Sequence, residues 1–386
     1  MDLAIFAKEL YTPLERIEQP VLLVEDGVIT SVGPLSQREI PKSHRILDLG
    51  DTTLAPGYID MHIHGGAGRD VMDTALDALP AVERLLYSHG VTTYFPTTIT
   101  APVDRTLAAL DHLAGAIEQA RESKELRARP VGIHLEGPFI SHLRRGVHPP
   151  ADLQKPSLAL FERLWEASRG TVKVMTIAPE LDGAREVISE ATRRGVCVSM
   201  GHSDADLEQA QAGVAAGVRH ATHTFNAMRP LEHRDPGILG EVLMDERVSA
   251  EIIADGIHVD PLIVRLFLRA KGAEGAILVT DATAATGMPN GRYRLGSLEV
   301  DVKDGKCLRD GRLAGSVLTM DKAVRNVVKF ANWDLQHAVR LATINPARAT
   351  GLSGAAGMLV AGAPADIVAL NLAGEVVKTI VRGRVA

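Results

Sequence analysis

Cysteine is almost absent from this sequence. The 386-residue chain has 2 cysteines, Cys197 and Cys307, and so small a number excludes a fold that depends on a disulfide framework. Cys197 stands in the apolar run 196–198, where a buried thiol that takes no part in chemistry is the simpler interpretation.

Long hydrophobic runs and an excess of positive charge are missing too. No apolar run approaches the roughly 20 residues that are needed to cross a bilayer, and the start of the chain has no basic segment leading into an apolar one. The formal net charge is -6, with lysine and arginine scattered along the chain, so nucleic acid is a poor candidate partner. We therefore expect a cytoplasmic protein with no nucleic acid or membrane partner.

The composition that remains is typical of a globular protein with a large core. Hydrophobic residues make up 46% of the chain and charged residues 23%, which is an ordinary balance for such proteins. A barrel of alternating strands and helices holds about 250 residues in one domain. A chain of 386 residues therefore has room for one barrel and a small second domain.

The two ends of the chain share a pattern of short β-type runs. Residues 21–24 and 28–32 are joined at Glu25-Asp26-Gly27, where Asp-Gly predicts a tight hairpin turn. Near the C-terminus, residues 366–370 and 376–381 flank another turn-rich break. We predict that residues 1–53 and 355–386 together form one small β-sandwich domain.

Between these ends, apolar β-branched runs alternate with segments of helical period, which indicates crossover units and a parallel sheet. The predicted strands lie at residues 54–63, 92–99, 131–135, 172–177, 196–200, 220–222, 248–253 and 276–280. The same strand-helix unit is repeated along the whole region, and this favours a closed barrel over an open sheet, because closure leaves no exposed edge. The predicted fold is an α/β protein with a (β/α)8 TIM barrel at residues 54–354 and an inserted β hairpin near 292–314.

Side chains that can bind metals follow several of the predicted strands. His62 and His64 alternate along the end of the first strand, so both imidazoles point to one side. The others are Glu136 after the third strand, His202 after the fifth, His223 after the sixth and Asp281 after the eighth. In such barrels the C-terminal rim carries the active site, so we expect these residues to meet there.

Each of these residues has a simpler explanation when it is taken alone. A single histidine is more often satisfied by backbone hydrogen bonds, and Glu136 could cap a helix or form a salt bridge. Histidines that converge on one rim make coincidence a poor explanation, and an unpaired charge at Asp281, after an apolar strand, would be costly. The pattern predicts a metal site, for which neutral imidazole is a common ligand.

These residues lie in motifs that resemble the amidohydrolase superfamily and, within it, the N-acetylglucosamine-6-phosphate deacetylase family. The resemblance covers essentially the whole chain. The motifs His-Leu-Glu-Gly-Pro at 134–138 and His-Thr-Phe-Asn-Ala-Met at 223–228 are specific to that family. The resemblance implies metal-dependent removal of the acetyl group from N-acetyl-D-glucosamine 6-phosphate, with Asp281 as the catalytic base and acid.

The resemblance also implies the metal content. Many superfamily members bridge two metals with a carbamylated lysine at the end of the fourth strand, whereas here Lys173 lies near the start of that strand, so Glu136 takes the bridging role. Some family members lack the second histidine of the first pair and bind one ion, but His62 and His64 are both present. We expect two divalent ions per subunit, and the ligands suit zinc, iron, manganese and cobalt alike.

Contacts with a sugar phosphate follow from the same resemblance. The matching positions are Val147, His148, Asn226, Ala227, Arg234, His258, Leu313, Ala314 and Gly315. His148 matches a histidine aimed at the acetamido group, and Asn226 matches part of a turn at the phosphate. Arg234 matches an arginine that reaches the neighbouring subunit's site, which implies a homodimer and suits a guanidinium, whose fork matches phosphate oxygens. On its own, Arg234 reads as a solvated loop charge.

Other functions remain compatible with these motifs. A deacetylase for the galactosamine epimer would use the same residues, and another cyclic-amide or aminoacyl hydrolase would need no phosphate on its substrate. A catalytically silent barrel could bind a sugar phosphate as a sensor, although retention of every expected ligand and of Asp281 speaks against it. The remaining histidines are expected to support the core (His89, His134) or to lie at surface or packing positions (His44, His112, His142, His220, His233, His337).

Overall fold

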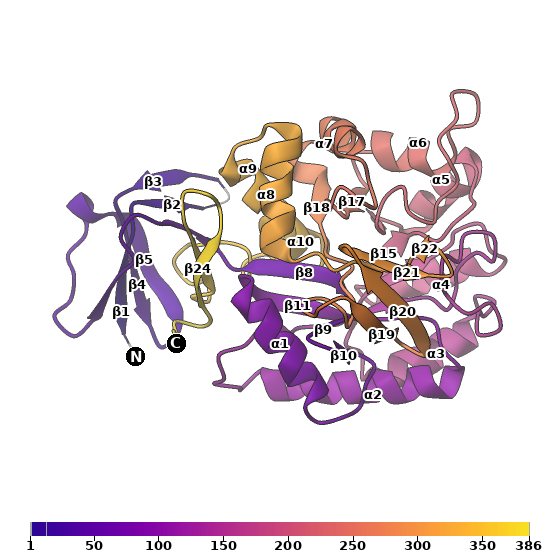
Figure 1. Ribbon diagram of the computed structural model, residues 1–386, viewed down its shortest axis with the longest axis horizontal. Coiled ribbons are helices and arrows are strands. Elements are labelled where there is room, and N and C mark those ends of the chain that lie inside the picture. The colour runs from indigo at the N-terminus through magenta and orange to yellow at the C-terminus, as the bar shows by residue number, and fades with distance from the viewer. Residues whose placement is uncertain (1, 13, 386) are drawn as a thin grey trace.

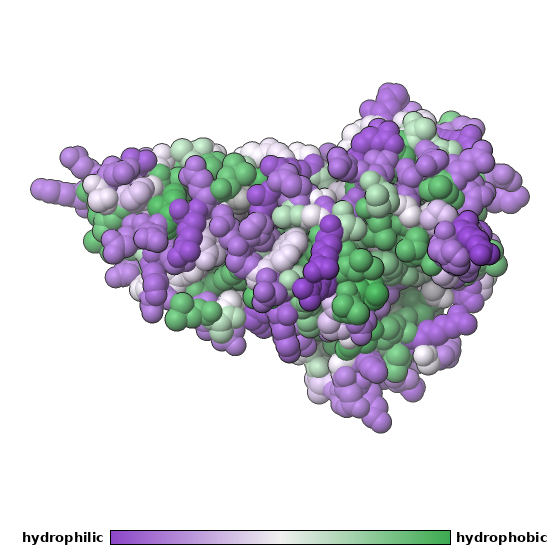
Figure 2. Space-filling view, turned by 90° about the horizontal axis from the view of Figure 1, so that it is seen from above, coloured by the Kyte–Doolittle hydropathy of each residue, from purple (hydrophilic) through white to green (hydrophobic). Residues whose placement is uncertain are grey.

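The computed structural model describes residues 2–12 and 14–385. Figure 1 shows a large part of mixed helices and strands beside a smaller part made of strands, in which both ends of the chain lie. Seen from above in Figure 2, polar residues cover most of the molecule and apolar residues appear between them on both halves. Among the described residues, no helix is long and apolar enough to cross a membrane.

Within the described residues, eight parallel strands form the barrel. In spatial order they are β8 (Tyr58–Ile63), β11 (Val91–Thr98), β13 (Ile133–Glu136), β14 (Val172–Ile177), β15 (Cys197–Met200), β16 (His220–Ala221), β17 (Ser249–Ile252) and β18 (Ala276–Leu278). A short strand, β12 (Arg129–Pro130), adds to β11, and a bridge between Ile63 and Ala282 joins the first strand to the last. Every residue of β8 and β11 is buried, as expected for strands covered on both faces. The (β/α)8 TIM barrel predicted from the sequence is confirmed.

A helix follows each barrel strand and covers its outer face. These helices are α1 (Ala78–Ser88), α2 (Val103–Ala120), α3 (Leu158–Ala167), α4 (Ala184–Arg193), α5 (Leu207–Ala216), α6 (Gly237–Met244), α7 (Pro261–Gly275) and α8 (Met320–Ala331), and α9 (Leu335–Arg340) and α10 (Ile344–Ala349) come after them. Helix α4 buries Ala184, Val187, Ile188 and Ala191, the spacing of one apolar helix face. The helices thereby bury the outside of the sheet and leave the strand ends to form the rim.

The chain ends form two sheets that share one apolar core. One has the order β5 (Val28–Pro34), β4 (Pro20–Glu25), β1 (Leu3–Phe6), β6 (Arg45–Asp48), and the other β24 (Val376–Ile380), β23 (Ile367–Leu370), β7 (Thr53–Pro56), β2 (Glu9–Tyr11), β3 (Arg16–Glu18). A 3-10 turn (Leu35–Gln37) follows β5. Leu22, Leu54 and Ile367 pack together between the sheets, so the terminal β-sandwich is present. The hairpin predicted at Asp-Gly is confirmed: β4 pairs with β5, and Asp26 and Gly27 have φ of 46° and 81°.

One predicted strand is wrong. Residues 54–63 do not form a single strand, because Gly57 separates β7 from β8. Strand β7 pairs with β2 and β23 of the terminal sheet, and β8 pairs with β11 of the barrel. A side chain at Gly57 would come within 2.3 Å of Thr92, so the backbones pass closely where the chain enters the barrel.

The division into domains at 1–53 plus 355–386 and 54–354 stays a prediction.

A small antiparallel sheet is inserted after β18, where the sequence indicates a single hairpin. It comprises β19 (Gly291–Leu295), β20 (Leu298–Lys303), β21 (Lys306–Arg309) and β22 (Arg312–Leu313). The residues of β20 alternate between buried and exposed, and the buried ones pack on Ile99 and Ala314 at the rim. A second pair, β9 (Gly65–Gly66) and β10 (Arg69–Asp70), follows β8. Both additions lie beside the carboxyl ends of the strands.

An ion pair joins the barrel to the terminal sheets, and its loss should destabilise the protein. Arg129 of β12 pairs with Asp366, whose side chain is 7% exposed and also accepts a hydrogen bond from the backbone N–H of Arg382. The substitution Asp366→Ala leaves the Arg129 charge largely buried without its partner, which costs about 3–5 kcal/mol. We expect this fall in the free energy of unfolding in urea denaturation. The exposed pair between Lys8 and Asp51 provides the control: Asp51→Ala should leave the midpoint almost unchanged, and equal shifts in both variants would contradict the prediction.

Candidate active site

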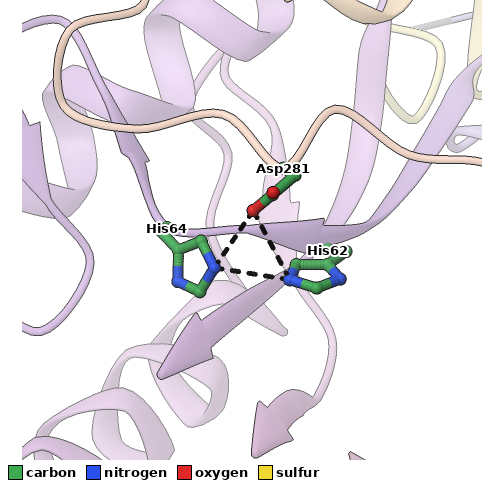
Figure 3. Close-up of side chains that lie close together, drawn as sticks. All are labelled: His62, His64 and Asp281. Carbon is green, nitrogen blue, oxygen red and sulfur yellow. Dashed lines mark hydrogen bonds and ion pairs between the residues drawn. The ribbon is translucent and has the colours of Figure 1, made fainter. Parts of the chain in front are cut away.

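The two histidines of β8 form one side of the site. The Nε2 atoms of His62 and His64 lie 3.3 Å apart. Asp281, which follows β18, places its Oδ1 3.2 Å from His64 Nε2 and 3.6 Å from His62 Nε2. Figure 3 shows the three side chains facing one another. Barrel closure between Ile63 and Ala282 brings them together, because each is next to a residue of the bridge.

Glu136, the last residue of β13, connects this group to a second pair of histidines. Its Oε1 lies 3.1 Å from His223 Nε2 and 3.2 Å from His202 Nε2. Its Oε1 is also 3.4 Å from His62 Nε2, and its Oε2 is 3.3 Å from His64 Nε2. The structure therefore gathers all six residues that the sequence suggested as ligands, and each is at most 7% exposed.

The outer nitrogen of several of these rings is already held by an acceptor. His64 Nδ1 lies 3.0 Å from the carbonyl oxygen of Thr97, and His202 Nδ1 lies 2.9 Å from that of Arg144. Since a carbonyl oxygen only accepts, Nδ1 carries the hydrogen in each neutral ring, and the Nε2 lone pair faces Glu136. Lone pairs and carboxylate oxygens thus point at one another and need cations between them.

The spacing of these atoms fits divalent metal ions. A tetrahedral ion with bonds of about 2.0–2.1 Å holds neighbouring ligand atoms about 3.3 Å apart, and the contacts here run from 3.1 to 3.6 Å. Two ligand sets share Glu136: one has His62, His64 and Asp281, and the other has His202 and His223. The donor chemistry of imidazole and carboxylate suits borderline divalent metals.

Burial and charge in the cluster favour positive charge at its centre. Burial raises the pKa of Glu136, but the adjacent imidazoles, His62 first, outweigh burial and hold that pKa well below its usual value. Burial lowers the pKa of His64, yet hydrogen bonds to Asp281 and Glu136 outweigh burial and raise that pKa to about 9. A metal cation would satisfy the carboxylates in the same way as these protons do.

The backbone is strained at the residues that follow the strands. His202, His223 and Asp281 have positive φ values of 48°, 25° and 49°, and so do Phe225 and Ala227, at 79° and 51°. Residues other than glycine rarely adopt this conformation, and each instance costs on the order of 1–3 kcal/mol and is found most often at functional sites. The surrounding structure therefore holds these side chains in positions that the backbone alone would not choose.

A cavity of about 180 Å³ opens above the cluster. Its lining includes His64, Glu136, Val147, His148, His202, His223, Asn226, Ala227, His258, Asp281, Leu313, Ala314 and Gly315, together with Ile99, Gly146 and Leu295. His62 lies beneath it with no exposed surface. Arg234 is exposed and does not line the cavity, and none of the described residues forms a hydrogen bond or ion pair with it. Every predicted substrate residue except Arg234 thus faces the cavity within one chain.

Two histidines of the lining have their orientation fixed by neighbours. The N–H of Thr100 donates to His148 Nδ1 at 3.3 Å, so the ring hydrogen is on Nε2, which lies 3.5 Å from Glu136 Oε2. Burial lowers the pKa of His148 to about 4, which keeps the ring neutral. His258 Nδ1 lies 2.7 Å from Asp255; burial lowers the pKa of His258, but Asp255 outweighs burial and raises that pKa.

Sequence reasoning missed two residues that support the cluster. Glu251 of β17 has no exposed surface and lies 2.9 Å from His62 Nδ1. His220, which the sequence analysis placed among surface or packing positions, is fully buried and contacts Glu251 at 3.2 Å. The sequence does indicate Glu251, because burying an unpaired glutamate in the apolar strand 248–253 would cost free energy, just as burying Asp281 after its own strand would.

His134 has the supporting role that the sequence indicates. Its Nδ1 lies 3.0 Å from the carbonyl oxygen of Met61 and its Nε2 lies 2.8 Å from Thr176 Oγ1. Burial lowers the pKa of His134 to about 3, so the ring stays neutral inside the barrel. It therefore braces the strands beneath the cluster.

A closed (β/α)8 barrel whose rim gathers imidazoles and carboxylates around a small cavity is typical of a metal-dependent enzyme. A sequence model of the amidohydrolase family matches residues 53–386. The chain belongs to the amidohydrolase family.

Several proteins of known family are similar along nearly the whole chain. An N-acetylglucosamine-6-phosphate deacetylase from Bacillus subtilis is 36% identical over 98% of this chain and 95% of its own. An N-acetylgalactosamine-6-phosphate deacetylase from Escherichia coli O157:H7 is 36% identical over 98% of both. The solved structure of a mutant N-acetyl-D-glucosamine-6-phosphate deacetylase from Mycobacterium smegmatis, in complex with N-acetyl-D-glucosamine-6-phosphate, gives a TM-score of 0.92 at 37% identity and covers 100% of this chain and 99% of that one.

Proposed function

We propose that this chain hydrolyses the acetamide of N-acetyl-D-glucosamine 6-phosphate to D-glucosamine 6-phosphate and acetate, using two divalent ions. The observation that carries the proposal is the convergence of Glu136, His62, His64, His202, His223 and Asp281 beneath the cavity. The similarity to deacetylases that act on amino-sugar phosphates along nearly the whole chain supports the substrate.

His62, His64, Glu136 and Asp281 would hold one ion, and Glu136, His202 and His223 the other. When bound, a divalent ion would lower the pKa of a bound water to near neutral, and the same ion would polarise the acetyl carbonyl. The Glu136 carboxylate would serve both sets, since its Oε2 faces His64 and its Oε1 faces His62, His202 and His223. These ligands suit zinc, iron, manganese and cobalt alike.

Asp281 and His148 act on the reacting atoms. Asp281 accepts the proton of the attacking water on a carboxylate oxygen and then delivers it to the departing amine nitrogen. A hydrogen-bond donor is needed where negative charge develops on the carbonyl oxygen. His148 would supply it, because Thr100 holds its Nδ1 as an acceptor and leaves the hydrogen on Nε2, and the residue lines the cavity.

The phosphate end of the substrate lies toward Asn226 and Ala227 in this proposal, and the partner subunit of a homodimer completes the site. Arg234 is on the exposed loop that follows these residues, outside the cavity of its own chain. Arg234 would thus act on the neighbouring cavity, in a protein that we place in the cytoplasm.

Replacement of Arg234 tests the phosphate contact. A hydrogen bond to a charged group contributes about 1.5–3 kcal/mol, so Arg234→Ala should raise KM about 10- to 100-fold and leave kcat nearly unchanged, as measured by acetate release. Arg105, another exposed arginine, provides the control, and Arg105→Ala should leave KM unchanged.

A mixture of two variants tests whether Arg234 acts across the interface. When Arg234→Ala and Asp281→Asn subunits are refolded together, a mixed dimer has one site with an intact Asp281 and an arginine from the partner. Activity at low substrate concentration should therefore exceed the sum of the separate variants. No gain in a verified mixed dimer would contradict contribution in trans.

The substrate itself is tested by comparing sugars on metal-loaded protein. The similarity to the Escherichia coli O157:H7 deacetylase makes N-acetyl-D-galactosamine 6-phosphate the second candidate, so kcat/KM is measured for both epimers and for unphosphorylated N-acetyl-D-glucosamine. We expect the glucosamine phosphate to react fastest and the unphosphorylated sugar slowest. Equal turnover without phosphate would favour another amide hydrolase of the family, and no acetate from any sugar would favour the sensor.

A further inference from the structure

Glu251 is a buried carboxylate that the reaction just proposed does not use. It lies within β17 and has no exposed surface. Burying an unpaired carboxylate is costly, and Glu251 is instead surrounded by donors. His62, His220 and the backbone N–H of His223 all lie within hydrogen-bonding distance of its two carboxylate oxygens.

The first donor is His62, one of the two histidines of β8. Its Nδ1 lies 2.9 Å from Glu251 Oε2. An ionised carboxylate only accepts hydrogen bonds, so the ring hydrogen of a neutral His62 sits on Nδ1. The Nε2 lone pair then faces Glu136 Oε1 at 3.4 Å and Asp281 Oδ1 at 3.6 Å. Glu251 thereby selects the tautomer of His62 that can bind a metal.

The second donor belongs to the residue that follows the sixth strand. The backbone N–H of His223 donates to the same Oε2 at 2.9 Å, and the backbone carbonyl of Glu251 accepts from the N–H of Thr224 at 2.9 Å. These bonds hold the segment in which His223 has a φ of 25°. One carboxylate oxygen therefore fixes a ligand from each of the two sets that share Glu136.

His220 and Ser249 support the other oxygen. His220 Nε2 lies 3.2 Å from Glu251 Oε1, and His220 Nδ1 lies 2.7 Å from Ser249 Oγ. Such a chain keeps the carboxylate in one orientation, because each member is held on both sides. Two divalent ions also carry more positive charge than Glu136 and Asp281 offset, and Glu251 adds a negative charge directly behind His62.

We propose that Glu251 is a positioning residue of the metal site, which fixes the His62 tautomer, anchors the segment of His223 and supplies a buried counter-charge for the ions. The proposal rests on the metal site of the proposed function. It assigns Glu251 no contact with the substrate, since Glu251 does not line the cavity.

The substitution Glu251→Gln separates charge from shape. The amide oxygen of the introduced side chain can still accept from His62 Nδ1 and the backbone of His223. The amide nitrogen would face His220 Nε2, and His220 can adopt the tautomer that donates from Nδ1 to Ser249 Oγ. The geometry is thus retained while the negative charge is lost. Glu83, which is 3% exposed and accepts a hydrogen bond from Tyr94, provides a matched buried carboxylate away from the site.

Metal affinity is the decisive measurement, made by equilibrium dialysis of Zn²⁺ against a competing chelator. We expect Glu251→Gln to weaken Zn²⁺ binding about 10- to 100-fold, to lower kcat, and to leave KM nearly unchanged. The control Glu83→Gln should keep wild-type affinity. Substitution of Co²⁺ for Zn²⁺ adds a spectroscopic readout, because a change in the ligands of the ion alters its visible absorption.

The outcomes distinguish the two proposals. Unchanged Zn²⁺ affinity and kcat in Glu251→Gln would overturn the role of Glu251 and leave the deacetylase proposal intact. Weakened affinity in Glu83→Gln to the same extent would also overturn it, because the effect would then be a general loss of stability. A wild-type protein that binds no metal would overturn the metal site of the proposed function itself.

Discussion

Replacement of Asp281 by asparagine is expected to lower kcat for acetate release by about 10²- to 10⁴-fold, the contribution of a well-placed acid and base. The amide has nearly the shape of the carboxylate but cannot accept the proton of the attacking water. Because Asp281 follows β18 with its Oδ1 3.2 Å from His64 Nε2, an asparagine oxygen can still occupy that position. The metal should therefore remain bound while turnover is lost.

The measurement pairs turnover with metal analysis of the same protein sample. Asp182, an exposed carboxylate beyond the end of β14, provides the control, and Asp182→Asn should retain wild-type turnover. Full activity in Asp281→Asn would remove Asp281 from the mechanism. Loss of metal together with activity would instead make Asp281 chiefly a ligand.

Removal of the Glu136 carboxylate should have the other large effect, because this group contacts both ligand sets. The substitution Glu136→Ala takes away the oxygens that lie 3.1 to 3.4 Å from His223, His202, His62 and His64. We expect metal affinity to fall by more than the about 10- to 100-fold that is typical for loss of a partner behind a ligand. Acetate release should fall to background, since the proposed ions would supply the nucleophilic water.

Metal content per subunit, measured on protein purified without chelators, tests this prediction. Wild-type protein stripped with a chelator should lose activity and regain it when metal returns, whereas Glu136→Ala should not regain it at the same metal concentration. A variant that still binds two ions with wild-type affinity would show that Glu136 does not bridge them.

The sequence predicted the rim residues because barrel geometry converts separation along the chain into proximity. His62, His202 and His223 are far apart in sequence, but each ends a parallel strand, and the carboxyl ends of such strands meet at one rim. The substrate side chains from Val147 to Gly315 were instead implied by the family resemblance and stay predictions, and all of them except Arg234 line the cavity.

The features that were missed depend on contacts that no strand pattern contains. The position of Glu251 within an apolar strand indicates a buried carboxylate, but the strand pattern does not show that its partners are His62 and His223. Similarly, residues 54–63 read as one apolar run, and the pairing of β7 with terminal strands that are distant in sequence decided the break at Gly57. Periodicity reports which face of a strand is buried but not which partner buries it.

The left-handed backbone at His202, His223 and Asp281 makes the rim energetically unfavourable to maintain in the folded chain. Bound ions would offset that strain, because a ligand that binds only the native state stabilises it in proportion to the logarithm of its concentration. The resistance of this protein to heat would then depend on the metal available in its surroundings, and a cell short of metal would lose the folded protein as well as its activity.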